Sequence, residues 1–341
     1  MEKLLIYGIG EQYKKLKTII NWENVSLDAF INSKVTEDCY EEGIKVITPK
    51  EASKKEFDYI LCATDIYEGE MRKELEKYGI PPEKIISGKL DYNNFLENSF
   101  LFSTSNILLF QNQNIEKEMS ILVERNQFCD IRHGIDWLDE NMSIIGDGDW
   151  AVGYSYLSVL CKILQIKMPS NILEMGLGQS SKVLMSYQKY SGCDYRIIEQ
   201  DEEWYRFFKK DTGSLLDHAQ VFIKPVKQVY NEKYGTNVNC YSDIGDVIEK
   251  SNTFDLISID GPWGSDGISR IDILPYIPQC LKKSWCILVD DYERIGEKNM
   301  IVELEEILQK SSTVYCKKIY GKYRQLCLFA SSDNKFFCSM F

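Results

Sequence analysis

The sequence predicts an α/β protein made of two Rossmann-like domains, and three observations lead to this. The chain has 341 residues, a comfortable length for two domains of ordinary size. Hydrophobic residues make up 44% and charged residues 27% of it, as in soluble globular proteins. In both halves, short apolar runs alternate with segments of helical spacing, which favours parallel sheets covered by helices.

The first ninety residues begin with a strand, a glycine turn and a helix. Residues 3–7 are an apolar run that stops at Gly8 and Gly10, and residues 11–20 have helical spacing. Residues 1–90 are therefore expected to form a small Rossmann-like domain. Its other strands are expected at 25–31, 59–63 and 84–86, with a helix at 68–78.

Residues 91–145 lack this alternation and are interpreted as a helical connector, because apolar spacing at 114–125 is typical of a helix. A glycine-rich turn at 146–149 opens the second domain, residues 146–341, where a helix is expected at 152–166. A parallel sheet closed by an antiparallel hairpin is the simplest topology for it. The expected elements are strands at 171–175, 195–198, 254–259 and 286–289, a helix at 298–309, and a hairpin of 314–319 with 325–330.

Charge and composition exclude several classes of function. A net charge of -12 repels phosphate backbones and anionic lipid, so no nucleic acid partner is expected. The sequence contains neither a signal peptide nor an apolar run long enough to cross a bilayer, which predicts a cytoplasmic protein without membrane insertion. Eleven scattered cysteines and only two histidines, His133 and His218, argue against a zinc site and are expected to be structural.

A candidate nucleotide site begins in the segment from Glu174 to Ser180, where a strand runs into Gly176 and Gly178 before a helix. Glycine lets a ligand approach the backbone, and the helix presents N–H groups. Glu199 ends the next strand, 21 residues after Gly178, where an acid accepts hydrogen bonds from ribose hydroxyls. Two alternatives remain, a purely structural turn and a solvated Glu199.

A second candidate site consists of aspartates that follow two further strands. Asp260 ends one strand, and Asp290 and Asp291 end another. The carboxyl ends of neighbouring parallel strands border one crevice, so the three carboxylates are expected to converge. Such oxygen ligands select Mg²⁺, Mn²⁺ or Ca²⁺. The alternative is that Asp290 and Asp291 cap the following helix.

Four segments, ILEMGLGQSS, IIEQDEEW, FDLISIDGPWG and CILVDDYER, resemble in order the nucleoside, ribose, strand-four and strand-five motifs of class I S-adenosylmethionine-dependent methyltransferases. The resemblance covers about residues 145–332 and implies a seven-stranded sheet with an antiparallel terminal hairpin. It implies that the glycine turn holds the methionyl part of the cofactor and that Glu199 holds its ribose. The cofactor-binding residues expected from it are Glu174, Gly176, Gly178, Ser180, Glu199 and Asp260.

The aspartates are similar to those of cation-dependent O-methyltransferases, where an Asp after strand four and an Asp-Asn pair after strand five bind the metal. This implies that Asp260, Asp290 and Asp291 hold a divalent cation, with Mg²⁺ as the expected ion. The lysine that commonly follows the strand-four aspartate in catechol-type enzymes is absent here. The carboxylates of Asp260, Asp290 and Asp291 therefore become the candidates for accepting a proton.

The segment from Gly261 to Arg270, with Glu293 and Arg294, resembles sugar O-methyltransferases, including the glucuronoxylan type. It implies that Arg270 and Arg294 clamp a carboxylate or phosphate of the substrate. The alternative is that each arginine pairs with nearby acids. Arg294 joins Asp260 and Asp291 as the expected catalytic residues, and Trp263 is expected to stack on a sugar or to cover the site.

Residues 1–88, including YGIGEQYKKL, GIKVITPKEA and FDYILCAT, resemble the small Rossmann-like domain that precedes the catalytic part of bacterial sugar acyltransferases and some sugar methyltransferases. Asn32 ends the second strand, where an NAD-binding domain usually has an acid. This argues against a dehydrogenase that uses Gly8 and Gly10. A nucleotide-sugar site and a purely structural role both remain open for this domain.

The expected function is methyl transfer from S-adenosylmethionine to a hydroxyl of a sugar or related polar metabolite, in surface-polysaccharide or natural-product biosynthesis. The expected cofactors are S-adenosylmethionine and a divalent cation, and the sequence is compatible with a homo-oligomer. The alternative is a non-catalytic sugar-nucleotide-binding or regulatory protein on the same scaffold.

Overall fold

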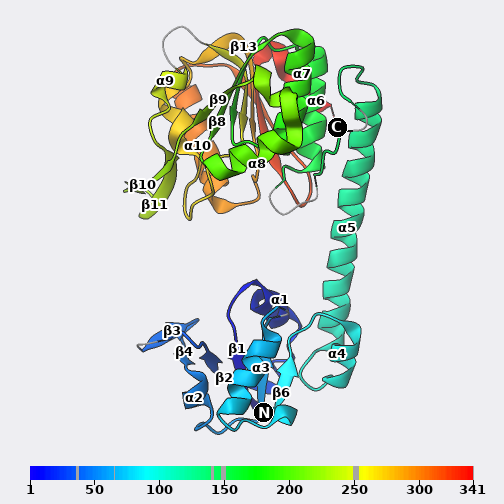
Figure 1. Ribbon diagram of the computed structural model, residues 1–341, viewed down its shortest axis with the longest axis vertical. Coiled ribbons are helices and arrows are strands. Elements are labelled where there is room, and N and C mark those ends of the chain that lie inside the picture. The colour runs from blue at the N-terminus through cyan, green and yellow to red at the C-terminus, as the bar shows by residue number, and fades with distance from the viewer. Residues whose placement is uncertain (36–37, 65, 140–141, 147–150, 249–252, 341) are drawn as a thin grey trace. The chain divides into compact units, whose positions relative to one another are not determined.

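The computed structural model describes residues 1–341 except 36–37, 65, 140–141, 147–150, 249–252 and 341 (Figure 1). It contains two compact units, Met1–Glu116 and Lys117–Phe341. The division falls within helix α5 (Thr104–His133). Most of the glycine-rich turn predicted at 146–149 lies outside the described residues.

The first unit contains a six-stranded sheet in the order β3-β4-β2-β1-β5-β6. All neighbouring strands are parallel except β3, which pairs antiparallel with β4. The strands are β1 (Glu2–Tyr7), β2 (Val25–Ile31), β3 (Cys39–Glu41), β4 (Ile44–Ile47), β5 (Tyr59–Cys62) and β6 (Ile85–Ser87). The helices are α1 (Glu11–Ile19), α2 (Pro49–Ala52), α3 (Glu68–Lys77) and α4 (Tyr92–Glu97), with α5 following.

The sheet of the first unit has an apolar cluster on each face. Leu4 and Ile6 belong to one cluster, and Leu5 and Tyr7 belong to the other, because successive residues of a strand point to opposite faces. The β3–β4 hairpin was not predicted. Its β3 strand has three exposed residues and carries no apolar alternation.

The second unit contains a seven-stranded sheet in the order β14-β15-β13-β12-β7-β8-β9. Strand β15 is antiparallel to both of its neighbours, and the other pairs are parallel. This is the predicted arrangement of a class I methyltransferase sheet with an antiparallel terminal hairpin. The strands are β7 (Asn171–Met175), β8 (Asp194–Glu199), β9 (Gln220–Ile223), β12 (Phe254–Ile259), β13 (Leu281–Val289), β14 (Tyr315–Tyr320) and β15 (Leu326–Ser331).

Helices cover both faces of this second sheet (Figure 1). The cluster on one face includes side chains of α6 and α7, and the cluster on the other includes side chains of α9 and α10. Strands β9, β10 (Val226–Asn231) and β11 (Thr236–Tyr241) were not predicted, because β9 is short and β10 is largely exposed. The helices are α6 (Tyr154–Ile166), α7 (Gln179–Ser191), α8 (Glu202–Thr212), α9 (Gly245–Ile248) and α10 (Ile295–Lys310).

Two properties of the described part of the chain bear on the composition argument. All eleven cysteines are free, and most of them are buried. None of the helices described is both long enough and apolar enough to cross a membrane.

Candidate functional site

The glycine turn after β7 lies against the ends of both neighbouring strands. The nitrogen of Gly176 donates to the oxygen of Ile198 at 2.8 Å, and the oxygen of Met175 accepts from Asp260 at 2.9 Å and from Gly261 at 2.7 Å. Gly176 has a φ of 100°, and a Cβ there would lie 3.0 Å from the nitrogen of Gly261. Both the left-handed backbone and the close approach therefore require glycine.

Gly178 faces open space on the other side of this turn. Its φ of -165° is extended, a conformation that any residue adopts. No atom within the described ranges lies within 4 Å of the place where its Cβ would be. The turn thus leaves room for a ligand beside the first turn of α7, where backbone N–H groups are exposed to it.

Glu174 lies beneath the turn and is completely buried. Its carboxylate accepts hydrogen bonds from Ser180 at 2.6 Å, from Ser181 at 2.8 Å and from the hydroxyl of Tyr195. Burial raises the pKa of Glu174 to about 7, and these three hydrogen bonds oppose the rise. Glu174 and Ser180 were both expected among the cofactor-binding residues. In the structure they bond to each other and stabilise the glycine turn.

Glu199 ends β8 next to the glycine turn. Its carboxylate accepts hydrogen bonds from the nitrogens of Leu177 at 2.8 Å, Gln200 at 2.6 Å and Asp201 at 2.7 Å. Burial raises the pKa of Glu199, and the three backbone donors lower it in part. An ionised carboxylate has about four acceptor positions, so this arrangement fixes the group and leaves capacity for a ligand hydroxyl.

The three aspartates predicted to converge lie together at the ends of β12 and β13. One ligand oxygen from each of Asp260, Asp290 and Asp291 lies within 4.8 Å of the others, a spacing that could hold a metal ion. Asp290 and Asp291 do not cap α10, because the N-cap position is Arg294 and no side chain caps it. The capping interpretation is therefore wrong. Asp291 has a φ of 60°, a left-handed conformation that Asp and Asn tolerate better than most residues.

A buried arginine crosses this acidic cluster. The Arg270 guanidinium donates to Oδ1 of Asp260 at 3.1 Å, to Oδ2 of Asp291 at 2.6 Å and to the backbone oxygen of Asp290 at 3.0 Å. Its Nε also lies 3.5 Å from Oε1 of Glu297. Arg270 is thus committed to the protein's own acids, and the expected substrate clamp is not available from this residue.

The acidic cluster retains an excess of negative charge. Among the residues that the structure describes, the four carboxylates of Asp260, Asp290, Asp291 and Glu297 are opposed by two guanidinium groups, those of Arg270 and Arg294. Burial raises the pKa of Asp260, Asp290 and Glu297, and the charge of Arg270 opposes each rise. Protons or a divalent cation could neutralise this excess.

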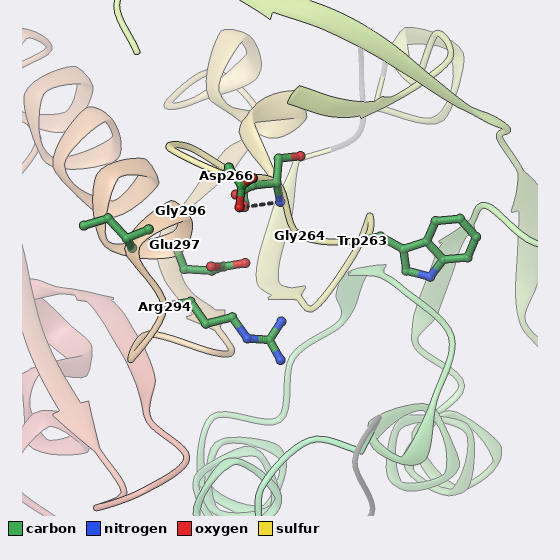
Figure 2. Close-up of a pocket in the computed structure, with 9 residues that line it drawn as sticks. Trp263, Gly264, Asp266, Arg294, Gly296 and Glu297 are labelled. Atoms are coloured by element: carbon green, nitrogen blue, oxygen red, sulfur yellow. Dashed lines mark hydrogen bonds between the residues drawn. The ribbon is translucent and has the colours of Figure 1, made fainter. Parts of the chain in front are cut away.

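A cavity of about 610 Å³ lies beside the cluster, between the loop after β12 and the start of α10 (Figure 2). Arg294 and Glu297 extend into it from the start of α10. The Arg294 side chain is 52% exposed, and its Nη1 lies 2.8 Å from Oδ2 of Asp291. Trp263 also lines the cavity, but its indole points away from Arg294 in this view and is largely exposed.

Several site residues were not found from the sequence. Glu297 lies three residues after Arg294 and faces the same cavity, so helical spacing could have indicated it. Gln200 accepts a hydrogen bond from the nitrogen of Trp263 at 3.2 Å, which ties the end of β8 to the loop after β12. That contact had no sequence signal. His133 and His218 are exposed at a helix end and in a 3₁₀ turn.

Comparison with known proteins gives a match for the amino-terminal residues. A family model described as "C2185-like, N-terminal" matches residues 1–86. No curated protein matches the chain.

Solved structures of methyltransferases are similar to the chain at low identity. An O-methyltransferase from Bacillus cereus in complex with S-adenosylhomocysteine is 16% identical, with a TM-score of 0.35, covering 50% of this chain and 79% of that one. The S-adenosylhomocysteine-bound methyltransferase PaMTH1 from Podospora anserina is 12% identical, with a TM-score of 0.39, covering 65% and 97%. Methyltransferase FkbM from Methylobacillus flagellatus is 12% identical, with a TM-score of 0.35, covering 96% and 90%.

Proposed function

We propose that the protein is an S-adenosylmethionine-dependent O-methyltransferase that acts on a sugar or a related polar hydroxyl metabolite. The supporting observation is the edge of the second sheet, where an open glycine turn, Glu199 and the aspartate cluster follow adjacent strands β7, β8, β12 and β13. Ligands of open α/β sheets bind outside the carboxyl ends of the strands. S-adenosylmethionine would supply a methyl group already activated by its sulfonium.

The residues of this edge divide into two tasks. The turn at Gly176 and Gly178 and the carboxylate of Glu199 would hold the methionyl and ribose parts of the cofactor. Asp260 and Asp291 would accept the proton of the acceptor hydroxyl, and the raised pKa of Asp260 makes that carboxylate a better base near neutral pH. Raised pKa at Asp260 is a direct consequence of its burial, only partly offset by Arg270. Alignment of the hydroxyl oxygen with the methyl carbon supplies much of the remaining rate.

The proposal includes a divalent cation held by Asp260, Asp290 and Asp291. Three carboxylate oxygens within 4.8 Å of one another could hold a metal ion, Mg²⁺ prefers oxygen ligands of this kind, and the excess negative charge of the cluster favours a cation. Arg270 occupies one oxygen of Asp260 and one of Asp291 and leaves their second oxygens for a metal. A bound Mg²⁺ would lower the pKa of the acceptor hydroxyl.

Titration calorimetry with S-adenosylhomocysteine tests the cofactor part of this proposal. Micromolar binding to the full-length protein is expected, and transfer of tritium from methyl-labelled S-adenosylmethionine to a panel of monosaccharides and nucleotide sugars should follow. Addition of Mg²⁺ should raise the rate and EDTA should lower it. A folded protein that gives no heat with S-adenosylhomocysteine would reject the proposal.

The alternative, a non-catalytic sugar-nucleotide-binding protein, would use the first sheet. Gly8 has a φ of 95° and lies between β1 and β5, where the strand order reverses. A thermal-shift panel separates the two functions. Stabilisation by nucleotide sugars alone favours the alternative, and stabilisation by adenosyl ligands favours methyl transfer.

A further inference from the structure

Two polar atoms from the start of α10 and one from the loop after β12 converge on one point of the cavity, beside the α-carbon of Gly264. A Cβ on Gly264 would lie 3.5 Å from Oε1 of Glu297 and 3.8 Å from both Nη1 of Arg294 and Oγ of Ser269. Gly264 is not among the glycines with a left-handed φ. Its backbone conformation therefore does not require glycine, and the absent side chain leaves this point open.

Glu297 brings to this point a hydrogen-bond acceptor that has no donor. Its side chain is 1% exposed, and across the described ranges Oε1 has no hydrogen-bond partner. The nearest cation, Nε of Arg270, is 3.5 Å away and also makes no hydrogen bond there. A buried acceptor without a donor destabilises the site, so a ligand that donates a hydrogen bond to Oε1 is favoured.

Arg294 brings the complementary donor. Its guanidinium carries five N–H groups, and the ion pair with Asp291 at 2.8 Å engages Nη1. A hydroxyl group both donates and accepts, so one ligand hydroxyl can donate to Glu297 and accept from Arg294. A carboxylate or phosphate would be repelled by Glu297, and an apolar group would leave its Oε1 without a donor.

We infer that this point binds a second hydroxyl group of the acceptor, so that the protein selects polyhydroxylated acceptors over those with a single hydroxyl. The inference rests on the proposed methyl transfer to a hydroxyl. It makes Glu297 and Gly264 specificity-determining residues. Asp291 links the hydroxyl-binding point to the aspartate cluster, because its carboxylate contacts both Arg294 and Arg270.

The variant Gly264→Ala tests the inference directly. The alanine methyl group fits, since its closest contact of 3.5 Å is an ordinary van der Waals distance, but it projects into the space that the ligand hydroxyl would enter. Binding of methyl glucoside, methyl galactoside and methyl glucosiduronate to the full-length protein is measured by saturation-transfer NMR without cofactor. At least one should bind to the wild type, and at least tenfold more weakly to Gly264→Ala.

Matched variants control for indirect effects. Gly134→Ala places its Cβ 3.5 Å from the oxygen of Ile131, outside the cavity, and should bind the glycoside as the wild type does. Glu297→Gln keeps the shape of the side chain and should weaken binding at least fivefold, whereas Glu306→Gln on the same helix should not. Removing one hydroxyl from the bound glycoside should reproduce the loss.

Equal affinity of the wild type and Gly264→Ala would overturn the inference, and so would a wild type that binds none of the three glycosides. Calorimetry with S-adenosylhomocysteine on the same preparations separates this result from the proposed function. Glycoside binding that Gly264→Ala abolishes, without binding of S-adenosylhomocysteine, would support the hydroxyl subsite and reject methyl transfer. Cofactor binding without glycoside binding would reject the subsite alone.

Discussion

The two sheets of this protein share one backbone arrangement at their first glycine turn. In the first sheet the nitrogen of Gly8 donates to Ile31 at 3.3 Å, and the oxygen of Tyr7 accepts from Ala63 at 2.8 Å. The second sheet repeats both bonds around Gly176. Each turn is thus fixed to the strand on either side of it, and both glycines have left-handed φ angles.

The side chains at corresponding strand ends are different. Strand register relates four positions of the first sheet to four of the second, and only the second set carries carboxylates. The pairs are Ile6 with Glu174, Asn32 with Glu199, Ala63 with Asp260, and Gly88 with Asp290. A glycine turn is therefore a property of the scaffold, and the acids at these four positions distinguish the candidate reaction site from the corresponding edge of the first sheet.

The largest expected effect is on the free energy of unfolding, and it comes from Glu174, whose counterpart in the first sheet is the apolar Ile6. The pKa of Glu174 is raised to about 7 by burial, so the folded state keeps a proton that the unfolded state releases above pH ~4.5. The free energy of unfolding should therefore fall by about 3 kcal/mol between pH ~4.5 and pH ~7. In Glu174→Gln this part of the fall should be missing.

Urea unfolding between pH 4.5 and pH 8, followed by tryptophan fluorescence, measures this difference, because five of the six tryptophans lie in the second unit. Glu232→Gln, at an exposed position, serves as the control and should keep the wild-type profile. Parallel profiles for the wild type and Glu174→Gln would show that Glu174 is ionised when folded.

The next effect compares Gly176→Ala with Gly8→Ala. Both replacements put a side chain at a left-handed φ and should cost about 1 kcal/mol of stability or more. Only Gly176→Ala also presses its Cβ on the Gly261 nitrogen and disturbs the proposed cofactor turn. We expect about a hundredfold weaker binding of S-adenosylhomocysteine for Gly176→Ala, and none of this loss for Gly8→Ala. Equal losses in both variants would mean that the two turns are not functionally different.

Glu199→Gln should weaken the binding of S-adenosylhomocysteine less than Gly176→Ala does. The backbone nitrogens of Leu177, Gln200 and Asp201 donate to both carboxylate oxygens of Glu199. A glutamine amide accepts only at its oxygen, so its NH₂ group would face a backbone donor and at least one hydrogen bond would be lost. One lost charge-assisted bond is worth roughly 1.5–3 kcal/mol, and we expect at least a tenfold loss in affinity for S-adenosylhomocysteine. Asn32→Ala changes the corresponding position of the first sheet and should leave this affinity unchanged. Calorimetry on both variants decides the matter.

The sequence was sufficient for most of the second sheet, because its central strands are buried on both faces and consist mostly of apolar residues. It was insufficient for β10 and β11, which pair with each other outside the large sheet, and whose exposed residues carry little apolar pattern. Strand β13 also begins earlier than its apolar core, at Leu281, since its first residues are polar.

Site residues could be predicted where they directly follow strands. They could not be predicted where their position depends on loops or on the packing of distant segments. Asp260, Asp290 and Asp291 were expected to converge because parallel strands end at one edge. The position of Arg270 among them depends on the path of the loop after β12. Helical spacing after Arg294 could have indicated Glu297, but the lack of a hydrogen-bond donor for its Oε1 depends on the packing of α10.

The smallest expected effect belongs to Tyr7, which precedes the first glycine turn as Met175 precedes the second. Its hydroxyl lies 2.5 Å from Oγ of Ser33 and donates to Glu74. Tyr7→Phe removes these bonds, but Glu74 is only partly buried, so water can replace the lost donor. Thermal denaturation should therefore show a loss of about 1 kcal/mol, with unchanged binding of S-adenosylhomocysteine. A change in that binding would mean that the end of β1 influences the proposed cofactor turn.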